Sequence, residues 1–255
     1  MAISPILAYK VTRNDFITSN VIHMDCVPLE GERPAFKAGQ FMMMHWRDAD
    51  GKLIDKPHSF SIASAPHEPG LSFAIKIYGP YTTRLSKEIL AGTTIHLQGP
   101  FGLFTLEKVT DPEVVLLAGG VGIAPFRGIL YHELGSRSGL TQMNTRINAE
   151  HSPRTFHVLY SNKTKTTFPY MEELDALALA QPDRLKINYT ITQDESPEWK
   201  GGRGRWTAES ISQVLQGYEG KMFFVCGPPP FVTEMVEQLQ KMGVVPQKIK
   251  IEKFT

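Results

Sequence analysis

Residues 114–130 read Val114-Val-Leu-Leu-Ala-Gly-Gly-Val-Gly-Ile-Ala-Pro-Phe-Arg-Gly-Ile-Leu130, and this stretch decides the fold of the second half of the chain. Its apolar, partly β-branched start is typical of a strand buried on both faces of a parallel sheet. Glycines follow, which let the backbone bend tightly and approach a ligand closely. A helix comes next, with Pro125 in its first turn, where a missing N–H does no harm. The unpaired N–H groups at this helix start predict a pyrophosphate site at Gly120, Val121, Gly122 and Ile123. For the motif alone, a purely structural turn is an equal alternative.

The composition is that of an ordinary globular protein. At 255 residues the chain can form one large domain or two of ordinary size. Hydrophobic residues make up 42% and charged residues 21%, which argues for well-packed cores and against disorder. The net charge of +1 gives no electrostatic reason to expect nucleic acid or an anionic membrane as a partner.

Neither a targeting segment nor a membrane span is expected from the sequence. The first residues, Met-Ala-Ile-Ser-Pro, lack the basic-then-apolar plan of a signal peptide. The longest apolar run, residues 114–126, is too short and too broken by glycine to span a bilayer. The two cysteines, Cys26 and Cys226, lie far apart, so no metal site, iron–sulfur centre or disulfide framework is expected. A cytoplasmic location is the expectation.

Residues 1–109 are expected to form an antiparallel β-barrel domain. Apolar residues alternate with polar or small ones over residues 22–26 and 71–77, and a compact apolar run covers residues 40–46. Turns containing glycine or proline separate these runs at short intervals, which is typical of a small barrel. One short helix is expected at Thr83–Leu90.

Residues 110–255 are expected to form a parallel α/β domain, because strand and helix patterns alternate from Val114 onward. The expected strands cover residues 156–160, 185–192, 222–226 and 249–251, and the expected helices cover residues 171–180 and 231–242. The polar stretch 135–154 is predicted to be a surface loop insertion.

Two motifs of the first domain could hold a ligand. The first is His58-Ser-Phe60-Ser61-Ile-Ala-Ser64, in which Phe60 could stack on a flat ring while Ser61 hydrogen-bonds the polar edge of that ring. The second is Gly79-Pro-Tyr81-Thr82-Thr83, whose N–H and hydroxyl groups could hold a phosphate ahead of a helix. The alternatives are an ordinary half-buried strand and a plain helix cap.

Two further motifs lie in the second domain. Cys226-Gly227-Pro228-Pro229-Pro230 ends a buried strand, and open parallel sheets bind ligands at that end. Cys226 could equally be a small buried hydrophobic residue. Glu252 and Phe254 follow the alternating Ile249 and Ile251, which argues against a frayed terminus.

Taken together and in this order, the motifs resemble the ferredoxin–NADP reductase-like family of flavoproteins over nearly the whole chain. Residues 58–64 match the family's Arg-x-Tyr-Ser-x-x-Ser flavin motif, and residues 79–82 match its Gly-x-x-Ser/Thr motif. Residues 119–125 match its pyrophosphate loop, and residues 226–229 match the strand end beside the nicotinamide. Residues 252–254 resemble its terminal Glu-x-aromatic sequence.

The resemblance implies a flavin-binding barrel joined to a nicotinamide-binding α/β domain. The implied flavin-binding residues are Lys56, His58, Phe60, Ser61, Ile75, Lys76, Ile77, Gly79, Tyr81, Thr82, Thr83 and Phe254. The implied nicotinamide-coenzyme residues are Gly120, Val121, Gly122, Ile123, Ser161, Asn162, Lys163, Cys226, Gly227, Pro228 and Pro229.

Two departures from the family pattern affect the flavin. His58 stands where the family has the arginine that pairs with the flavin pyrophosphate, and Phe60 stands where it has tyrosine. Phenylalanine still stacks but gives up a hydroxyl, and histidine carries less dependable charge than arginine. Lys56 could supply the missing positive charge. FAD is the expected flavin, and FMN stays open.

The resemblance implies that four residues, Ser61, Cys226, Glu252 and Phe254, carry the chemistry, with Phe60 as a further residue that stacks on the flavin. Phe60 and Phe254 would cover the two faces of the flavin ring, and Ser61 would hydrogen-bond near its N5. Cys226 would pack near the nicotinamide, and Glu252 would be a polar or proton-handling group. Hydride transfer itself belongs to the cofactors.

The partners implied are NAD(P)H and a separate electron acceptor, which could be a ferredoxin, a flavodoxin or an oxygenase component. NADPH is expected over NADH, because the second strand ends in Ser161, Asn162 and Lys163 rather than in an acidic residue. Lys165, Arg203 and Arg205 add cations that suit a 2′-phosphate, although scattered surface cations are an alternative. A non-catalytic electron-relay subunit and a flavin-free nicotinamide-binding module are the rival functions.

Overall fold

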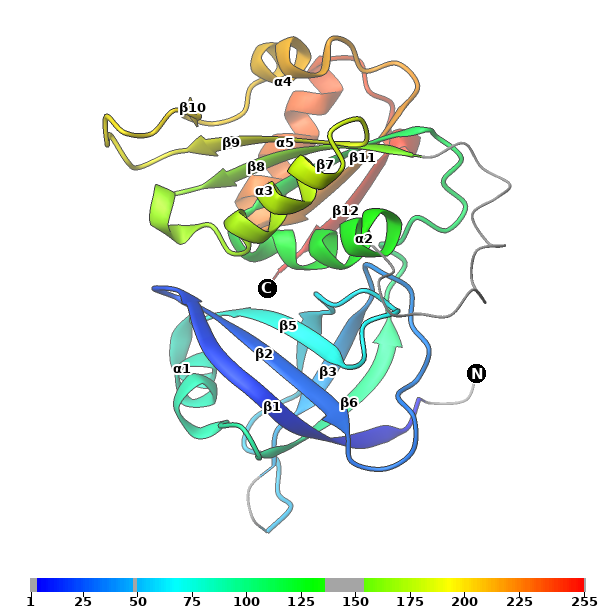
Figure 1. Ribbon diagram of the computed structural model, residues 1–255, viewed down its shortest axis with the longest axis vertical. Coiled ribbons are helices and arrows are strands. Elements are labelled where there is room, and N and C mark those ends of the chain that lie inside the picture. The colour runs from blue at the N-terminus through cyan, green and yellow to red at the C-terminus, as the bar shows by residue number, and fades with distance from the viewer. Residues whose placement is uncertain (1–3, 48–49, 136–153, 255) are drawn as a thin grey trace. The chain divides into compact units, whose positions relative to one another are not determined.

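The computed structural model describes residues 4–47, 50–135 and 154–254, which form two compact units. One unit holds the chain up to Leu106 together with Ala124–His132. The other holds Glu107–Ile123 and the chain from Glu133 onward. Each unit is built around one six-stranded sheet (Figure 1).

The sheet of the first unit is antiparallel, in the order β4-β3-β6-β1-β2-β5. Its strands are β1 Ile6–Thr18, β2 Val21–Pro28, β3 Phe41–His45, β4 His58–Ser61, β5 Leu71–Lys76 and β6 Thr94–Phe101. The two outer strands meet, because Ile62 bridges to Phe73 and the N–H of Ala63 donates to the carbonyl of Ser72 at 2.7 Å. The predicted antiparallel barrel is therefore confirmed.

The barrel core follows from the alternation in the sequence. Ile22, Met24 and Cys26 on β2 are at most 1% exposed, and they pack in one cluster with Phe73 and Ile75 of β5. Successive side chains of a strand point to opposite faces, so alternate apolar positions fill the barrel interior.

The barrel's helix begins earlier than predicted. Helix α1 covers Gly79–Glu88 rather than Thr83–Leu90. The ring of Pro80 presets the backbone for a first helical turn, so the helix starts beside this residue and not after the threonines.

The sheet of the second unit is parallel, in the order β10-β9-β8-β7-β11-β12. Its strands are β7 Glu113–Gly119, β8 Thr155–Asn162, β9 Leu185–Ile191, β10 Gly202–Arg203, β11 Lys221–Gly227 and β12 Ile249–Lys253. Its helices are α3 Met171–Ala180, α4 Ala208–Leu215 and α5 Pro229–Lys241. This confirms the predicted parallel α/β architecture.

Helices cover both faces of the parallel sheet. Ile211 of α4 and Met235 of α5 share one cluster with Val115, Leu117 and other sheet residues. Helix α3 lies on the opposite face (Figure 1). Because both faces are covered, the central strands β7 and β11 are apolar almost throughout.

Helix α2, Ala124–Leu134, follows the glycine-rich loop, yet its residues up to His132 belong to the barrel unit. A Cβ on Gly128 would lie 2.8 Å from the carbonyl oxygen of Ser64, so only glycine allows this close approach. The guanidinium of Arg127 donates to the carbonyl of Ala63 at 2.9 Å and lies 3.1 Å from the Glu68 carboxylate. These contacts attach α2 to the barrel segment that follows β4.

Two sequence expectations concern other parts of the chain. The loop insertion predicted at residues 135–154 falls almost wholly outside the described residues. Within the described ranges, no helix is long and apolar enough to cross a bilayer.

Candidate functional site

The parallel sheet has a topological switch point between β7 and β11. From β7 the chain passes to β8 and β9 on one side, and it returns to β11 and β12 on the other side. Ala118 near the end of β7 is the register partner of Cys226 near the end of β11. Open α/β sheets bind ligands outside the carboxyl ends of the strands at such a point.

The glycine-rich loop lies directly against the end of β11. The loop forms a 3₁₀ turn, η1, over Gly120–Ile123. A Cβ on Gly122 would lie 2.1 Å from the carbonyl oxygen of Cys226 and 2.9 Å from the Cα of Gly227. Only glycine fits at this position, so the structure brings together two motifs that are far apart in the sequence.

The start of this helical segment suits an anion. The first N–H groups of a helix have no partner within it and carry a partial positive charge. Neither η1 nor the first turn of α2 contains an acidic residue. The backbone of Gly120, Val121 and Gly122 therefore fits the pyrophosphate of a dinucleotide.

Three of the four residues with expected chemical roles lie together at the ends of β11 and β12. Glu252 is the register partner of Cys226, and the N–H of Phe254 donates to the carbonyl of Gly227 at 3.1 Å. Cys226 is fully buried, and burial, with the charge of Glu252 adding to it, raises the pKa of the thiol well above its usual value. Cys226 is therefore a neutral packing residue. Ser61, the fourth, lies in the barrel unit, where it is 7% exposed.

The end of β8 is supported by a cluster of aromatic rings. Phe168 packs edge-on against Tyr160 at 4.8 Å and parallel to Trp199 at 5.7 Å. Of the three residues expected to bind the coenzyme here, Ser161 is buried, Asn162 is half-buried and Lys163 is exposed. The Oδ1 of Asn162 accepts a hydrogen bond from the backbone N–H of Lys163.

The cations that favoured NADPH have partners within the second unit. The guanidinium of Arg203 donates to the carbonyl of Asp194 at 2.6 Å and also to the carbonyl of Ser196. The guanidinium of Arg205 lies 2.7 Å from the carboxylate of Glu234. Both arginines are exposed, and each has a partner that the sequence did not reveal.

In the barrel unit, the first flavin motif begins β4. His58 stacks on the ring of Tyr81, with centroids 3.8 Å apart and planes at 20°, and its Nε2 lies 3.3 Å from the Asp55 carboxylate. Phe60 is half-buried against the barrel core, and Lys56 is exposed. His58 and Tyr81 from the two expected motifs are therefore neighbours.

The second flavin motif forms the first turn of α1. The hydroxyl of Thr82 donates to the carbonyl of Tyr78 at 2.7 Å, and that of Thr83 donates to the carbonyl of Gly79 at 2.8 Å. With both hydroxyls engaged, a phosphate here would be held by backbone N–H groups. The turn contains no acidic residue, which fits that role.

The strand residues Ile75, Lys76 and Ile77 differ in what they could offer a cofactor. The side chain of Ile75 is 1% exposed within the barrel core, so only its backbone could reach a ligand. Lys76 and Ile77 are partly exposed, and the N–H of Ile77 donates to the carbonyl of Asn20 at 2.7 Å.

Known proteins match this chain in both units. The FAD-binding domain family matches residues 7–121, and the oxidoreductase NAD-binding domain family matches residues 116–237. The NADH-cytochrome b5 reductase 1 of Debaryomyces hansenii is 32% identical over 236 residues, which is 88% of this chain and 76% of that protein. The chain belongs to the ferredoxin–NADP reductase-like family of flavoproteins. The resemblance found in the sequence is thus confirmed.

Two further similarities place this flavoprotein among its relatives. The reductase component of propane 2-monooxygenase from Rhodococcus jostii is 27% identical over 253 residues. The alignment covers 96% of this chain but only 63% of that protein's length. The fold matches a ferredoxin NADP⁺ reductase from Neisseria gonorrhoeae, determined with bound FAD and NADP, with a TM-score of 0.79 at 22% identity. That alignment covers 98% of this chain and 99% of the other.

Sequence reasoning missed one residue beside the glycine-rich loop, Tyr160, whose hydroxyl donates to the carbonyl of Gly120 at 2.9 Å. Tyr160 was not singled out, although it directly precedes the predicted Ser161–Lys163 segment.

Proposed function

We propose that this flavoprotein is an FAD-dependent NAD(P)H reductase that passes electrons to a separate acceptor. The observation that carries the proposal is the close packing of the Gly119–Ile123 loop against Cys226 and Gly227 at the switch point. That packing would build a dinucleotide site from two motifs, in a chain that also carries an FAD-binding domain.

FAD supplies hydride acceptance and the release of electrons one at a time, and the residues of the chain supply geometry. Backbone groups of η1 would hold the coenzyme pyrophosphate. Cys226, neutral and buried, would shape the wall beside the nicotinamide, and Glu252 would be the polar or proton-handling group. Phe60 and Phe254 as ring-covering residues, and Ser61 as a hydrogen-bond partner, are part of the same proposal.

The domain roles also belong to the proposal. Residues 1–109 would bind the flavin, and residues 110–255 would bind the coenzyme. The acceptor would be a ferredoxin, a flavodoxin or an oxygenase component, since one relative is the reductase component of a monooxygenase. A cytoplasmic location is proposed with it.

The preference for NADPH stays a prediction. The partners of Arg203 and Arg205 leave the exposed Lys163 and Lys165 as its main support, while one relative is named for NADH. The ratio of kcat/KM for the two coenzymes decides this point.

The test of the function is a visible spectrum of the purified protein before and after anaerobic addition of NADPH or NADH. A yellow protein that releases FAD on heating and loses its flavin absorption with either coenzyme supports the proposal. A yellow protein whose absorption persists with both coenzymes would instead be a relay subunit. A colourless protein that cannot be reconstituted would be a flavin-free module.

A further inference from the structure

Arg127 is a buried cation of α2 to which the proposed function gives no role. Its side chain is 10% exposed. Nη1 donates to the carbonyl oxygen of Ala63 at 2.9 Å, and Nη1 and Nη2 donate to the two carboxylate oxygens of Glu68 at 3.1 and 3.3 Å. A buried cation is costly unless it is paired and hydrogen-bonded, so these bonds hold α2 and the segment of Ala63 and Glu68 together.

The segment that Arg127 holds has further bonds of its own. The N–H of Ala65 donates to the carboxylate of Glu68, and the N–H of Glu68 donates to the carbonyl of Ala65 at 3.0 Å. Nη2 of Arg33 donates to the carbonyls of Pro66 and Glu68 at 2.5 and 2.9 Å. Residues 63–65 are fully buried. A segment bonded in this way is stiff, so it gives α2 a firm attachment.

Both ends of the Arg127–Ala63 bond lie close in the sequence to an expected cofactor motif. Ala63 comes two residues after Ser61, the residue expected to hydrogen-bond near the flavin ring. Two residues span at most about 7 Å. Arg127 comes four residues after Ile123, where η1 ends and α2 begins, and four residues of helix rise about 6 Å. Only short stretches of chain therefore separate this bond from the two motifs.

The division between the two units falls inside this helical segment. Gly120–Ile123 belongs to the unit of the parallel sheet, and Ala124–His132 belongs to the barrel unit. Gly128 adds a second attachment within the barrel unit, because it approaches the carbonyl of Ser64 so closely that a Cβ would lie 2.8 Å from that oxygen. The glycine-rich loop is thus continuous with a helix whose body is fixed to the segment after the flavin motif.

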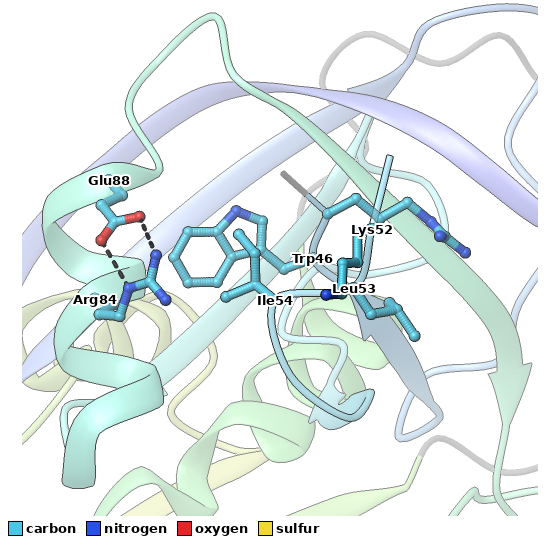
Figure 2. Close-up of a pocket in the computed structure, with 7 residues that line it drawn as sticks. Trp46, Lys52, Leu53, Ile54, Arg84 and Glu88 are labelled. Carbon is cyan, nitrogen blue, oxygen red and sulfur yellow. Dashed lines mark hydrogen bonds and ion pairs between the residues drawn. The ribbon is translucent and has the colours of Figure 1, made fainter. Parts of the chain in front are cut away.

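A second paired arginine of the barrel unit shows what distinguishes Arg127. Arg84 and Glu88 line a pocket of about 550 Å³ together with Trp46 (Figure 2). Nε and Nη2 of Arg84 donate to the two carboxylate oxygens of Glu88 at 2.8 and 2.9 Å. Both partners belong to α1 and are half-exposed, so this ion pair lies within one helix and adds little stability. Arg127 is buried, and its partners lie on another segment.

We propose that Arg127 is a positioning residue for hydride transfer, an inference that rests on the proposed function. In that step the C4–H bond of the nicotinamide breaks and the hydride, with its two electrons, bonds to N5 of FAD, so NAD(P)H is oxidised and FAD is reduced. The bonds of Arg127 to Ala63 and Glu68 hold the glycine-rich loop where the coenzyme can react. A misplacement of about 1 Å can slow such a reaction about a hundredfold.

The experiment follows flavin reduction in the full-length, flavin-bound protein by anaerobic stopped-flow absorbance. Arg127→Met keeps a side chain of similar length and removes its bonds. We expect the reduction rate at saturating NADPH or NADH to fall at least about tenfold. The dissociation constant of NADP⁺ or NAD⁺ should stay within about threefold, because the glycine-rich loop itself is unchanged. Arg127→Lys keeps the charge and should restore part of the rate.

Arg33→Met is the matched control. The bonds of Arg33 go to the same segment, at Pro66 and Glu68, and not to α2. This variant should lose stability but reduce its flavin at the unmodified rate, which separates positioning from a general weakening of the barrel.

Two further measurements do not depend on turnover. Hydrogen exchange of the α2 amides should be faster in Arg127→Met and unchanged in Arg33→Met. A nicotinamide stacked on a flavin gives a long-wavelength absorption band. When NADP⁺ or NAD⁺ is added to the reduced protein, this band should be weaker in Arg127→Met than in the unmodified protein.

The inference is overturned, and the proposed function stands, if Arg127→Met reduces its flavin at the unmodified rate, or if Arg33→Met slows the reaction equally. If Arg127→Met does not fold, Glu68→Gln replaces it, since it removes only the charged partner. That variant should slow reduction about threefold, and an unchanged rate would overturn the inference in the same way. An unmodified protein whose flavin neither coenzyme reduces would overturn the proposed function itself.

Discussion

The hydroxyl of Tyr160, at the end of β8, donates a hydrogen bond to the carbonyl oxygen of Gly120 in the glycine-rich loop, 2.9 Å away. Gly120 has a φ of +55°, a left-handed conformation that the hydrogen bond helps to fix. Burial raises the pKa of the Tyr160 hydroxyl well above its usual value, so the group stays protonated and donating at neutral pH. The fully buried side chain of Tyr160 on β8 thus holds the backbone of the loop that follows the neighbouring strand β7.

Tyr160→Phe keeps the ring and removes the hydrogen bond. We expect the free energy of unfolding to fall by about 1 kcal/mol. The KM for the coenzyme should rise about threefold to tenfold with kcat unchanged, because the loss affects binding. Tyr189→Phe is the matched control: its hydroxyl donates to Asp175 at 2.6 Å in the same aromatic cluster, so KM should stay constant. Equal KM changes in both variants would refute a specific role for Tyr160.

Gly122→Ala should displace the glycine-rich loop, because its Cβ would lie 2.1 Å from the carbonyl oxygen of Cys226. We expect coenzyme affinity to drop at least about tenfold, as measured by equilibrium titration, while bound flavin is retained. Gly220→Ala is the control: its φ is +71°, no atom lies within 4 Å of the added Cβ, and only strain of about 1–2 kcal/mol results. Unaltered coenzyme binding by Gly122→Ala would contradict the assignment of the loop.

Cys226 should not react with iodoacetamide in the folded protein, because the thiol is fully buried and its pKa is raised. The buried Cys26 should behave alike, since burial raises the pKa of its thiol as well. Mass spectrometry should find both thiols unmodified at pH 8 and both modified in denaturant. Rapid labelling of native Cys226 would show a reactive thiol and would end its assignment as a packing residue.

Arg127→Met should lower the free energy of unfolding by about 2–4 kcal/mol, because Glu68 loses its charged partner and the carbonyl of Ala63 loses a donor. The double variant Glu68→Gln/Arg127→Met should be destabilised by less than the sum of the single variants. Denaturant unfolding measures all three variants. Strict additivity would show that the ion pair does not attach α2 to the barrel.

The barrel should lose stability in acid partly through Asp25. Burial alone would raise the pKa of this carboxyl, but hydrogen bonds from His23 at 2.8 Å and Ser72 at 2.5 Å bring it below its usual 3.8. When the pKa of a carboxyl is lower in the folded protein than in the unfolded chain, its ionised form stabilises the fold at pH values above the unfolded-state pKa. That contribution disappears as the pH falls through the folded value.

Asp25→Asn should therefore cost about 1–2 kcal/mol at pH 7, and the difference should close as the pH falls through the lowered pKa of Asp25. Urea unfolding at several pH values measures this. Asp15→Asn is the control, since Asp15 forms an exposed ion pair with Arg13, and it should change stability by less than about 1 kcal/mol. A difference for Asp25→Asn that persists unchanged into acid would contradict the assignment.

The sequence by itself determined the two kinds of sheet and the order of the motifs. Alternation at Ile22, Met24 and Cys26 marks the inside of a barrel, because strand side chains point alternately to two faces. The unbroken apolar run after Val114 marks a strand covered on both faces, and the glycines after it mark a tight loop. These are local properties of the chain, readable without knowing which segments meet.

Only the tertiary structure decided which groups meet. It attached α2 to the barrel through Gly128 and Arg127, and it gave Arg203 and Arg205 partners that their charge alone could not predict. The Tyr160–Gly120 hydrogen bond and the Trp46–Arg84 pocket were equally hidden. Each depends on side chains from separate segments, and a periodic pattern records burial but not the identity of the neighbour.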